Sequence, residues 1–228
     1  PGSGSDVVAR VLAKRLPETF GQTAVVDNRG ILAPEIAAKA APDGYTVLFY
    51  STPLWVSPLL QTKSQWDATR DFAPVTLAVN APNLLAVHPS LPVKSVRELL
   101  ALSKARPGEL NYGSGSVGSS SHLAAELFNA MAGVNIVRVP YRGVGPATVG
   151  LLGGQVQVLF PSAGAGLPYV KSGRMRALAV ASTKPSALLP DVPTIAAAGV
   201  PGHLFRGGNL LSFVRSLLPA RRRIAASG

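Results

Sequence analysis

Short apolar runs alternate along the chain with stretches in which apolar residues recur every three or four positions. The apolar runs predict β-strands over 23–26, 45–50, 72–79, 83–87, 135–139, 156–160 and 176–181. The other stretches predict helices that begin after Asp6, after Ser95 and at Pro146, and shorter ones over 36–40, 123–132 and 167–171. This order is typical of an α/β fold with mainly parallel sheets. The nearly continuous apolar run at 45–50 indicates a strand covered on both faces.

One loop between two of these elements has an unusual composition. Residues 113–122 read Gly-Ser-Gly-Ser-Val-Gly-Ser-Ser-Ser-His, after a short apolar segment and before the helix expected at 123–132. Glycines allow the backbone to approach a ligand closely, and the first amides of a helix carry the positive end of its dipole. The serine hydroxyls add further donors. We therefore expect an anion site here, for phosphate, a cofactor or a carboxylate, with Ser114, Gly115, Ser116, Gly118, Ser119, Ser120 and His122 as candidate contacts.

Two other segments lie where ligands bind in α/β folds, beyond the carboxyl ends of strands. The chain opens with a loop of similar composition, in which Ser3, Gly4 and Ser5 precede a helix, and Ser51 and Thr52 follow the strand at 45–50. The opening loop and the serine loop could face each other across a cleft. A helix this early needs a strand to pack on, so the chain has the appearance of a fragment.

Composition excludes several classes of function. The net charge is +11, but residues 203–228 hold five arginines and no acid, which leaves +6 dispersed over the rest. Aromatic residues are 6% of the chain, so a basic face with stacking rings for nucleic acid is not expected. There is no cysteine, and the three histidines at 88, 122 and 203 are scattered, so no metal site is expected. No run of 18 apolar residues suggests a membrane-spanning helix.

Two enzymatic interpretations of the serine loop were weighed against the anion site. Gly113, Gly115 and Gly118 satisfy the dinucleotide-binding pattern, which keeps a nicotinamide-dependent enzyme open as the alternative function. The next strand, however, offers Arg138 rather than the acid that binds ribose. The nucleophile elbow of serine hydrolases fails, because Ser116 lacks a glycine two residues before it. No catalytic residue and no cofactor are predicted.

Several motifs in sequence point to a known family. They are Asp43-Gly44-Tyr45-Thr46, Asp71-Phe72-Ala73-Pro74-Val75, the run from Leu110 to Ala124, Val139-Pro140-Tyr141-Arg142-Gly143, Leu151-Leu152-Gly153-Gly154-Gln155, Leu178-Ala179-Val180 and Leu189-Pro190-Asp191-Val192-Pro193-Thr194. Their order and spacing over about residues 1–202 closely resemble the Bug family, the periplasmic solute-binding proteins of tripartite tricarboxylate transporters.

The resemblance implies a two-lobed Venus-flytrap fold of the periplasmic-binding-protein type II class, with an incomplete first lobe. Lobe 1 would comprise 1–80, to which 197–228 return or remain disordered, and lobe 2 would comprise 81–196. Such a protein is a periplasmic monomer without enzymatic activity. It would bind a dicarboxylate, tricarboxylate, acidic amino acid or aromatic acid between the lobes and deliver it to the membrane subunits of the transporter.

The chain also departs from the family pattern. Acidic residues common in the family are replaced by Gly150, Gln157 and Pro161. The aspartate usual at Pro161 lies near the pocket, so its loss should favour plain carboxylates over amine-bearing ligands. The basic segment 203–228 looks like a shifted reading frame. A non-functional fragment of a binding protein is therefore a further alternative.

Overall fold

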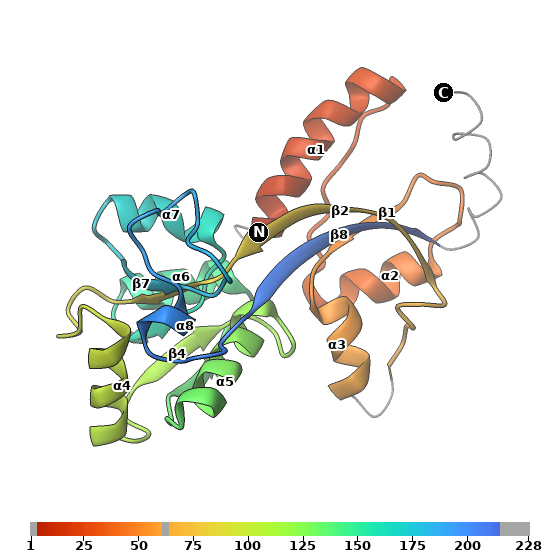
Figure 1. Cartoon of the computed structure of the whole chain (residues 1–228). Coiled ribbons are helices and arrows are strands. Elements are labelled where there is room, and N and C mark those ends of the chain that lie inside the picture. The colour runs from red at the N-terminus through yellow and green to blue at the C-terminus, as the bar shows by residue number, and fades with distance from the viewer. Residues whose placement is uncertain (1–3, 61–63, 215–228) are drawn as a thin grey trace. The chain divides into compact units, whose positions relative to one another are not determined.

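The computed structural model describes residues 4–60 and 64–214, with backbone only over 206–214 (Figure 1). The described residues divide into two compact units. Ala81–Gly207, with Gly4, form the serine-loop unit, and Ser5–Asn80, with 208–214, form the N-terminal unit. None of the helices in the described ranges combines the length and apolarity needed to cross a membrane.

The serine-loop unit is built on a five-stranded sheet with the order β5-β4-β6-β3-β7. Its strands are β3 (Leu84–Val87), β4 (Asn111–Ser114), β5 (Val137–Pro140), β6 (Val158–Leu159) and β7 (Arg176–Val180). β4 runs parallel to both β5 and β6, whereas β3 is antiparallel to β6 and β7. The sheet is therefore mixed, with β3 running opposite to the other four strands.

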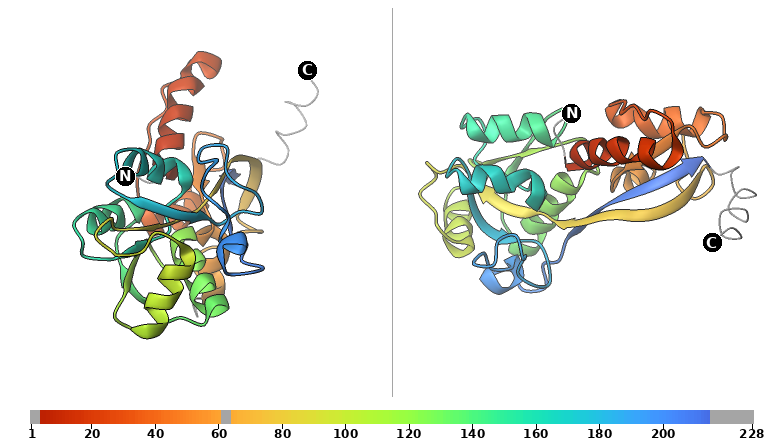
Figure 2. Two further views of the ribbon diagram at one scale, coloured as in Figure 1. Left: turned by 60° about the vertical axis from the view of Figure 1, so that its left-hand side comes forward. Right: turned by 90° about the horizontal axis from the view of Figure 1, so that it is seen from above.

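Helices cover both faces of this sheet (Figures 1 and 2). One face packs against α4 (Val96–Ala105), α5 (Ser120–Ala132) and α8 (Ile195–Ala198), and the other against α6 (Val144–Leu152) and α7 (Ala163–Lys171). Consecutive side chains of β3 point to opposite faces of the sheet. Leu85 and Val87 pack on the face covered by α4, α5 and α8, and Ala86 packs on the face covered by α6 and α7. All four residues of β3 are buried, so this strand is covered on both faces.

The N-terminal unit contains helices and a three-stranded sheet with the order β1-β8-β2. Its elements are α1 (Gly4–Phe20), a 3₁₀ turn (Gly30–Leu32), α2 (Ala33–Lys39), β1 (Val47–Tyr50), α3 (Pro53–Leu60), β2 (Phe72–Pro82) and β8 (Arg206–Val214). β1 and β8 are antiparallel, with Val47 opposite Phe213. The core of this unit consists of Ala37, Leu48, Leu54, Trp66 and Phe72.

Three sequence predictions for the N-terminal unit are wrong in detail. Residues 23–26 form no strand, because no described strand lies beside them, and Val25 is 86% exposed. Only Leu48 of β1 is buried, so this strand is not covered on both faces. The first helix does not begin after Asp6, because Asp6 lies inside the first turn of α1. Its carboxylate accepts hydrogen bonds from Arg10 Nε at 3.1 Å and Asn28 Nδ2 at 3.0 Å.

Predicted helix boundaries in the serine-loop unit are confirmed to within a few residues. Ser95 caps α4 by accepting a hydrogen bond from the Glu98 amide at 3.2 Å, and the Glu98 carboxylate accepts one from the Lys94 amide. α5 begins three residues earlier than expected, at Ser120 rather than Leu123. The reason is that Ser119 acts as its N-cap, which converts half of the serine stretch into the first turn of the helix.

Candidate functional site

The serine loop connects the end of β4 to the start of α5, and hydrogen bonds within it fix its shape. The Gly115 amide donates to Ser121 Oγ at 3.1 Å, and the Ser119 and Ser121 hydroxyls lie 3.1 Å apart. The Ser119 hydroxyl also accepts from the His122 amide at 3.4 Å. Gly118 has a φ of 76°, a backbone conformation that favours glycine. The hydroxyls of Ser119 and Ser121 therefore serve mainly to build the loop.

Backbone amides are what the loop leaves unpaired. Within the described ranges, the amides of Ser116, Val117, Ser120 and Ser121 donate to no protein acceptor. Ser120 and Ser121 are the first two residues of α5, where the helix itself provides no acceptor. These amides point with the positive end of the helix dipole, so they form the anion-attracting part of the loop.

A second helix start lies beside the first. β4 and β5 are parallel neighbours, so the helices that follow them, α5 and α6, both begin at the same edge of the sheet. Gly115 is so close to α6 that a methyl group on it would lie 3.5 Å from the Val144 backbone nitrogen. The amides of Gly143, Val144 and Gly145 also have no acceptor among the described residues. Two sets of unpaired donors are thus brought to one place.

Arg138 supplies a full positive charge beneath these donors. Its guanidinium donates from Nε to Ser114 Oγ at 2.7 Å and from Nη2 to the Gly115 carbonyl at 3.0 Å. Ser114 is completely buried, so its hydroxyl supports Arg138 from below the loop. In the sequence, Arg138 stands out only because it lies on the strand where a dinucleotide-binding fold would carry an acid. The available signal in the sequence was that Arg138 is the one cation on β5.

His122 adds a neutral polar group to the site. Burial, followed by the nearby charge of Arg138, lowers the pKa of its imidazole. Its Nδ1 accepts a hydrogen bond from the Gly118 amide at 3.2 Å, so the neutral ring carries its proton on Nε2. His122 is therefore a hydrogen-bond donor at neutral pH, through Nε2.

The carboxyl end of β6 meets the same edge of the sheet. β6 is parallel to β4, with Gly113 opposite Leu159, and Pro161 follows two residues later. Pro161 is buried, and its carbonyl accepts from the Leu84 amide at 2.8 Å. The structure thus places Pro161 at the same sheet edge as Ser114 and Gly115.

The remaining predicted contacts belong to the N-terminal half of the chain. Ser3 lies outside the described residues, and Gly4 and Ser5 are the first residues of α1. Ser51 and Thr52 precede α3, and their carbonyls accept hydrogen bonds from the Leu54 and Trp55 amides at 3.0 and 3.1 Å. Both are half-buried.

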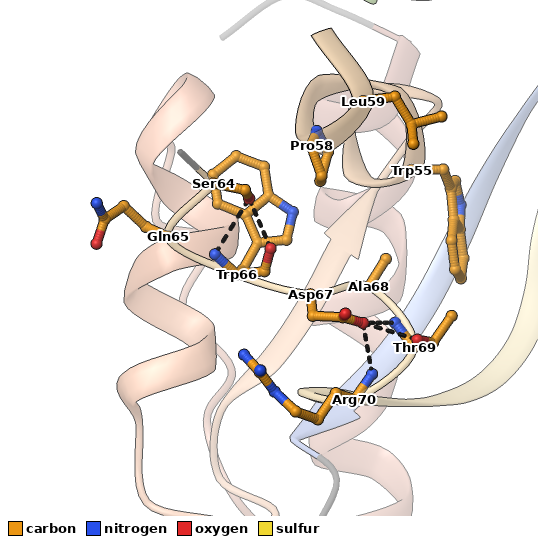
Figure 3. A pocket seen from close by; sticks show the side chains of 10 residues that line it. All are labelled: Trp55, Pro58, Leu59, Ser64, Gln65, Trp66, Asp67, Ala68, Thr69 and Arg70. Atoms are coloured by element: carbon orange, nitrogen blue, oxygen red, sulfur yellow. Dashed lines mark hydrogen bonds between the residues drawn. The ribbon is translucent and has the colours of Figure 1, made fainter. Parts of the chain in front are cut away.

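The N-terminal unit also has a pocket of about 520 Å³, lined by Trp55, Pro58 and Leu59 of α3 and by 64–70 (Figure 3). Its polar groups bond to one another. Asp67 accepts from the Thr69 hydroxyl at 2.7 Å and from the Thr69 and Arg70 amides at 2.8 Å. These bonds lower the pKa of Asp67 to about 2, so the carboxylate is ionised at neutral pH. Its hydrogen bonds are made to Thr69 and Arg70 of the same turn. We assign this pocket no ligand.

The geometry argues against the dinucleotide-binding interpretation of the serine loop. A methyl group on Gly113 would lie 3.2–3.4 Å from the side chains of Val156, Ala147 and Leu159, so this glycine lies in a tightly packed part of the core and does not face a ligand. Arg138 is engaged with Ser114 and Gly115 instead of being presented to a cofactor phosphate. In the described part of the chain, no three His, Asp or Glu side chains gather as a metal site.

Two α/β units, one of which presents unpaired amides at the carboxyl edge of its sheet, are characteristic of the solute-binding proteins. The chain belongs to the tripartite tricarboxylate transporter receptor family, whose model matches residues 8–207. It is 41% identical over 207 residues to Protein BugT of Bordetella pertussis and 39% identical to a UPF0065 protein of Pseudomonas sp. strain P51. These alignments cover 88% and 89% of this chain but 64% and 62% of the relatives. The chain thus spans less than two thirds of their length.

Solved structures agree with this assignment. A protein of R. palustris solved with adipate has a TM-score of 0.91 at 38% identity, with 94% of this chain and 73% of that chain covered. MatC from Rhodopseudomonas palustris, with bound malate, has a TM-score of 0.90 at 28% identity, covering 96% and 76%. The periplasmic binding protein BugD has a TM-score of 0.89 at 29% identity, with 94% of this chain and 73% of that chain covered. The predicted periplasmic-binding-protein fold and the Bug resemblance are confirmed.

Proposed function

We propose that this chain is the solute receptor of a tripartite tricarboxylate transporter and binds a small carboxylate at the serine loop. The observation that carries the proposal is the meeting of two helix starts, α5 and α6, beside the serine loop, whose first residues bind the guanidinium of Arg138. Unpaired amides are matched to the lone pairs of a carboxylate, and the partial charges of two helices add to the charge of Arg138.

The proposed site follows the residues predicted from the sequence. In lobe 2 (81–196) the contacts are the amides of the serine loop, the hydroxyls of Ser116 and Ser120, His122 through Nε2, and Pro161 as part of the wall. Lobe 1 (1–80, with part of 197–228) contributes Ser3, Gly4, Ser5, Ser51 and Thr52. The receptor acts in the periplasm as a monomer and passes its ligand to the membrane subunits of the transporter. It has no catalytic step.

We infer that the ligand is a plain dicarboxylate. Pro161 provides no negative charge at the position where the family resemblance implies an aspartate, so an ammonium group would find no counter-ion there. Two similar proteins solved with adipate and with malate support this class of ligand. An amine-bearing acid such as aspartate should therefore bind more weakly than succinate.

The test is isothermal titration calorimetry of the full chain with adipate, malate, succinate and aspartate. Dimethyl adipate, which has the same chain but no charge, is the matched control and should not bind. NAD and NADP are titrated in parallel and should give no heat. The proposal fails if no carboxylate binds, which would favour the fragment interpretation, or if the neutral diester binds as tightly as adipate.

A further inference from the structure

Helix α6, which begins beside the serine loop, contains a glycine in its interior where no turn requires one. Gly150 is buried, and glycine weakens a helix interior relative to alanine. The neighbouring side chain explains its presence. A β-carbon at position 150 would lie 2.7 Å from Cζ of Tyr141 and would overlap the tyrosine hydroxyl. The ring of Tyr141 thus occupies the space that a side chain at position 150 would need.

Tyr141 is attached to the anion site through its backbone and to α6 through its side chain. Its amide donates to the Ser114 carbonyl at 2.9 Å, at the beginning of the serine loop. Its hydroxyl donates to Gln155 Oε1 at 3.3 Å, and the backbone amide of Gln155 donates to the Gly150 carbonyl at 2.9 Å. The ring also packs against the cluster that contains Ala147 and Leu151 of α6. One residue therefore joins the end of β4 to the body of α6.

The segment held in this way is short. Only Arg142 and Gly143 separate Tyr141 from the first residue of α6, and the Gly143 carbonyl accepts from the Ala147 amide at 3.2 Å. The unpaired amides of Gly143, Val144 and Gly145 follow directly. The position of Tyr141 therefore determines the direction in which these three amides point.

We propose that Tyr141, seated against Gly150, is a positioning residue that aims the amides at the start of α6 toward the ligand. This rests on the proposed function, because it assigns those amides to the bound carboxylate. The family resemblance implies an acidic residue at this position, and in this chain its replacement by Gly150 leaves the space that the Tyr141 ring occupies.

The first test is Gly150→Ala, with Gly164→Ala as its matched control. Gly164 is also a helical glycine, in α7, but an added methyl group there meets nothing within 4 Å. Calorimetry with adipate, or with malate if adipate does not bind, should show roughly tenfold weaker affinity for Gly150→Ala, as for one lost oriented hydrogen bond. Gly164→Ala should bind as the parent does, and neither variant should have a lower melting temperature.

The second test removes the ring. In a Tyr141→Ala background, Gly150→Ala should cause no further loss of affinity, because nothing remains for the methyl group to displace. Additive losses in the double variant would overturn the proposal, since they would mean that position 150 acts independently of Tyr141.

A ligand-free measurement separates this proposal from the function on which it rests. Amide hydrogen exchange should show faster exchange at Tyr141 and Ala147 in Gly150→Ala than in Gly164→Ala. If the parent binds no carboxylate, the proposed function fails while the exchange result still decides whether Gly150 seats this segment. Unchanged exchange at both amides, or unchanged affinity despite faster exchange, overturns the positioning role.

Discussion

Arg138 and Ser114 form the closest polar link beneath the serine loop, with the guanidinium Nε 2.7 Å from the serine hydroxyl. The two residues lie on adjacent parallel strands, β5 and β4, so the pairing of these strands sets their separation. A buried serine and a half-buried arginine thereby fix the start of the loop and place a positive charge under it. The same hydrogen bond therefore holds the start of the loop and positions the charge of Arg138.

Replacing Arg138 should weaken both the fold and carboxylate binding. Arg138→Gln removes the charge and two charge-assisted hydrogen bonds, so we expect a loss of stability of about 1–3 kcal/mol. Affinity for adipate should fall about tenfold or more, because the site loses its full positive charge. Urea unfolding measures the first effect and calorimetry the second.

Arg176→Gln is the matched control. Arg176 also donates to backbone carbonyls, those of Pro89, Leu91 and Val93, but it does so at the start of β7, away from the serine loop. It should destabilise the protein to a similar degree and leave the affinity unchanged. Equal losses of affinity in the two variants would show that Arg138 acts only through the fold.

The amide of Ser120 can be removed without disturbing its helix. Ser120 is the first residue of α5, where proline is well tolerated, and Ser119 before it has the extended conformation (φ −65°, ψ 156°) that precedes proline. Ser120→Pro deletes the amide hydrogen and the hydroxyl, whereas Ser120→Ala deletes the hydroxyl alone. Calorimetry should show roughly tenfold weaker adipate binding for the proline variant than for the alanine variant. Equal affinities would exclude this amide from the site.

A strand can be predicted from its own residues only in part, because its formation also depends on a partner strand elsewhere in the chain. Short apolar runs predict the strands at 83–87 and 156–160, and β3 and β6 lie within these ranges. Residues 23–26 are a similar short apolar run but form no strand, since a strand also needs a hydrogen-bonded neighbour.

The same distinction applies to the candidate site. Glycine and serine between a strand and a helix predicted an anion-attracting loop, and the loop does present unpaired amides. The sequence could not show which serines bond within the loop, because this depends on side-chain geometry. It also could not show the role of Arg138, which requires knowing that β5 pairs with β4 in register.

The buried carboxylate of Asp6 should stabilise the N-terminal unit. It holds Asn28 and Arg10, and it is 8% exposed, so Asp6→Ala leaves two donors without their acceptor. We expect a loss of roughly 1–3 kcal/mol in urea unfolding. Asp27→Ala removes the exposed partner of Arg29 in the same unit and should change stability by less than about 1 kcal/mol. A similar cost for both substitutions would contradict the role given to Asp6.

His203 should make the serine-loop unit sensitive to acid. Its ring is buried edge-on to Phe128, and neither ring nitrogen has a hydrogen-bond partner among the described side chains and backbone. Burial lowers the pKa of this imidazole below its usual value. The unfolded chain therefore takes up a proton near pH 6.5 that the folded chain resists, so stability falls as the pH drops below about 6.5 and levels off below the folded pKa.

The substitution His203→Leu should reduce this acid sensitivity. Leucine has a similar volume to histidine but does not titrate. The decrease in melting temperature between pH 7.5 and pH 5 should therefore be smaller than in the parent. A part of the decrease should persist, because burial lowers the pKa of His122 in the same direction. At pH 7.5 the variant should be at least as stable as the parent, since two unpartnered polar atoms are lost from the core. An unchanged pH profile would mean that His203 is not among the groups that couple folding to protonation in this range.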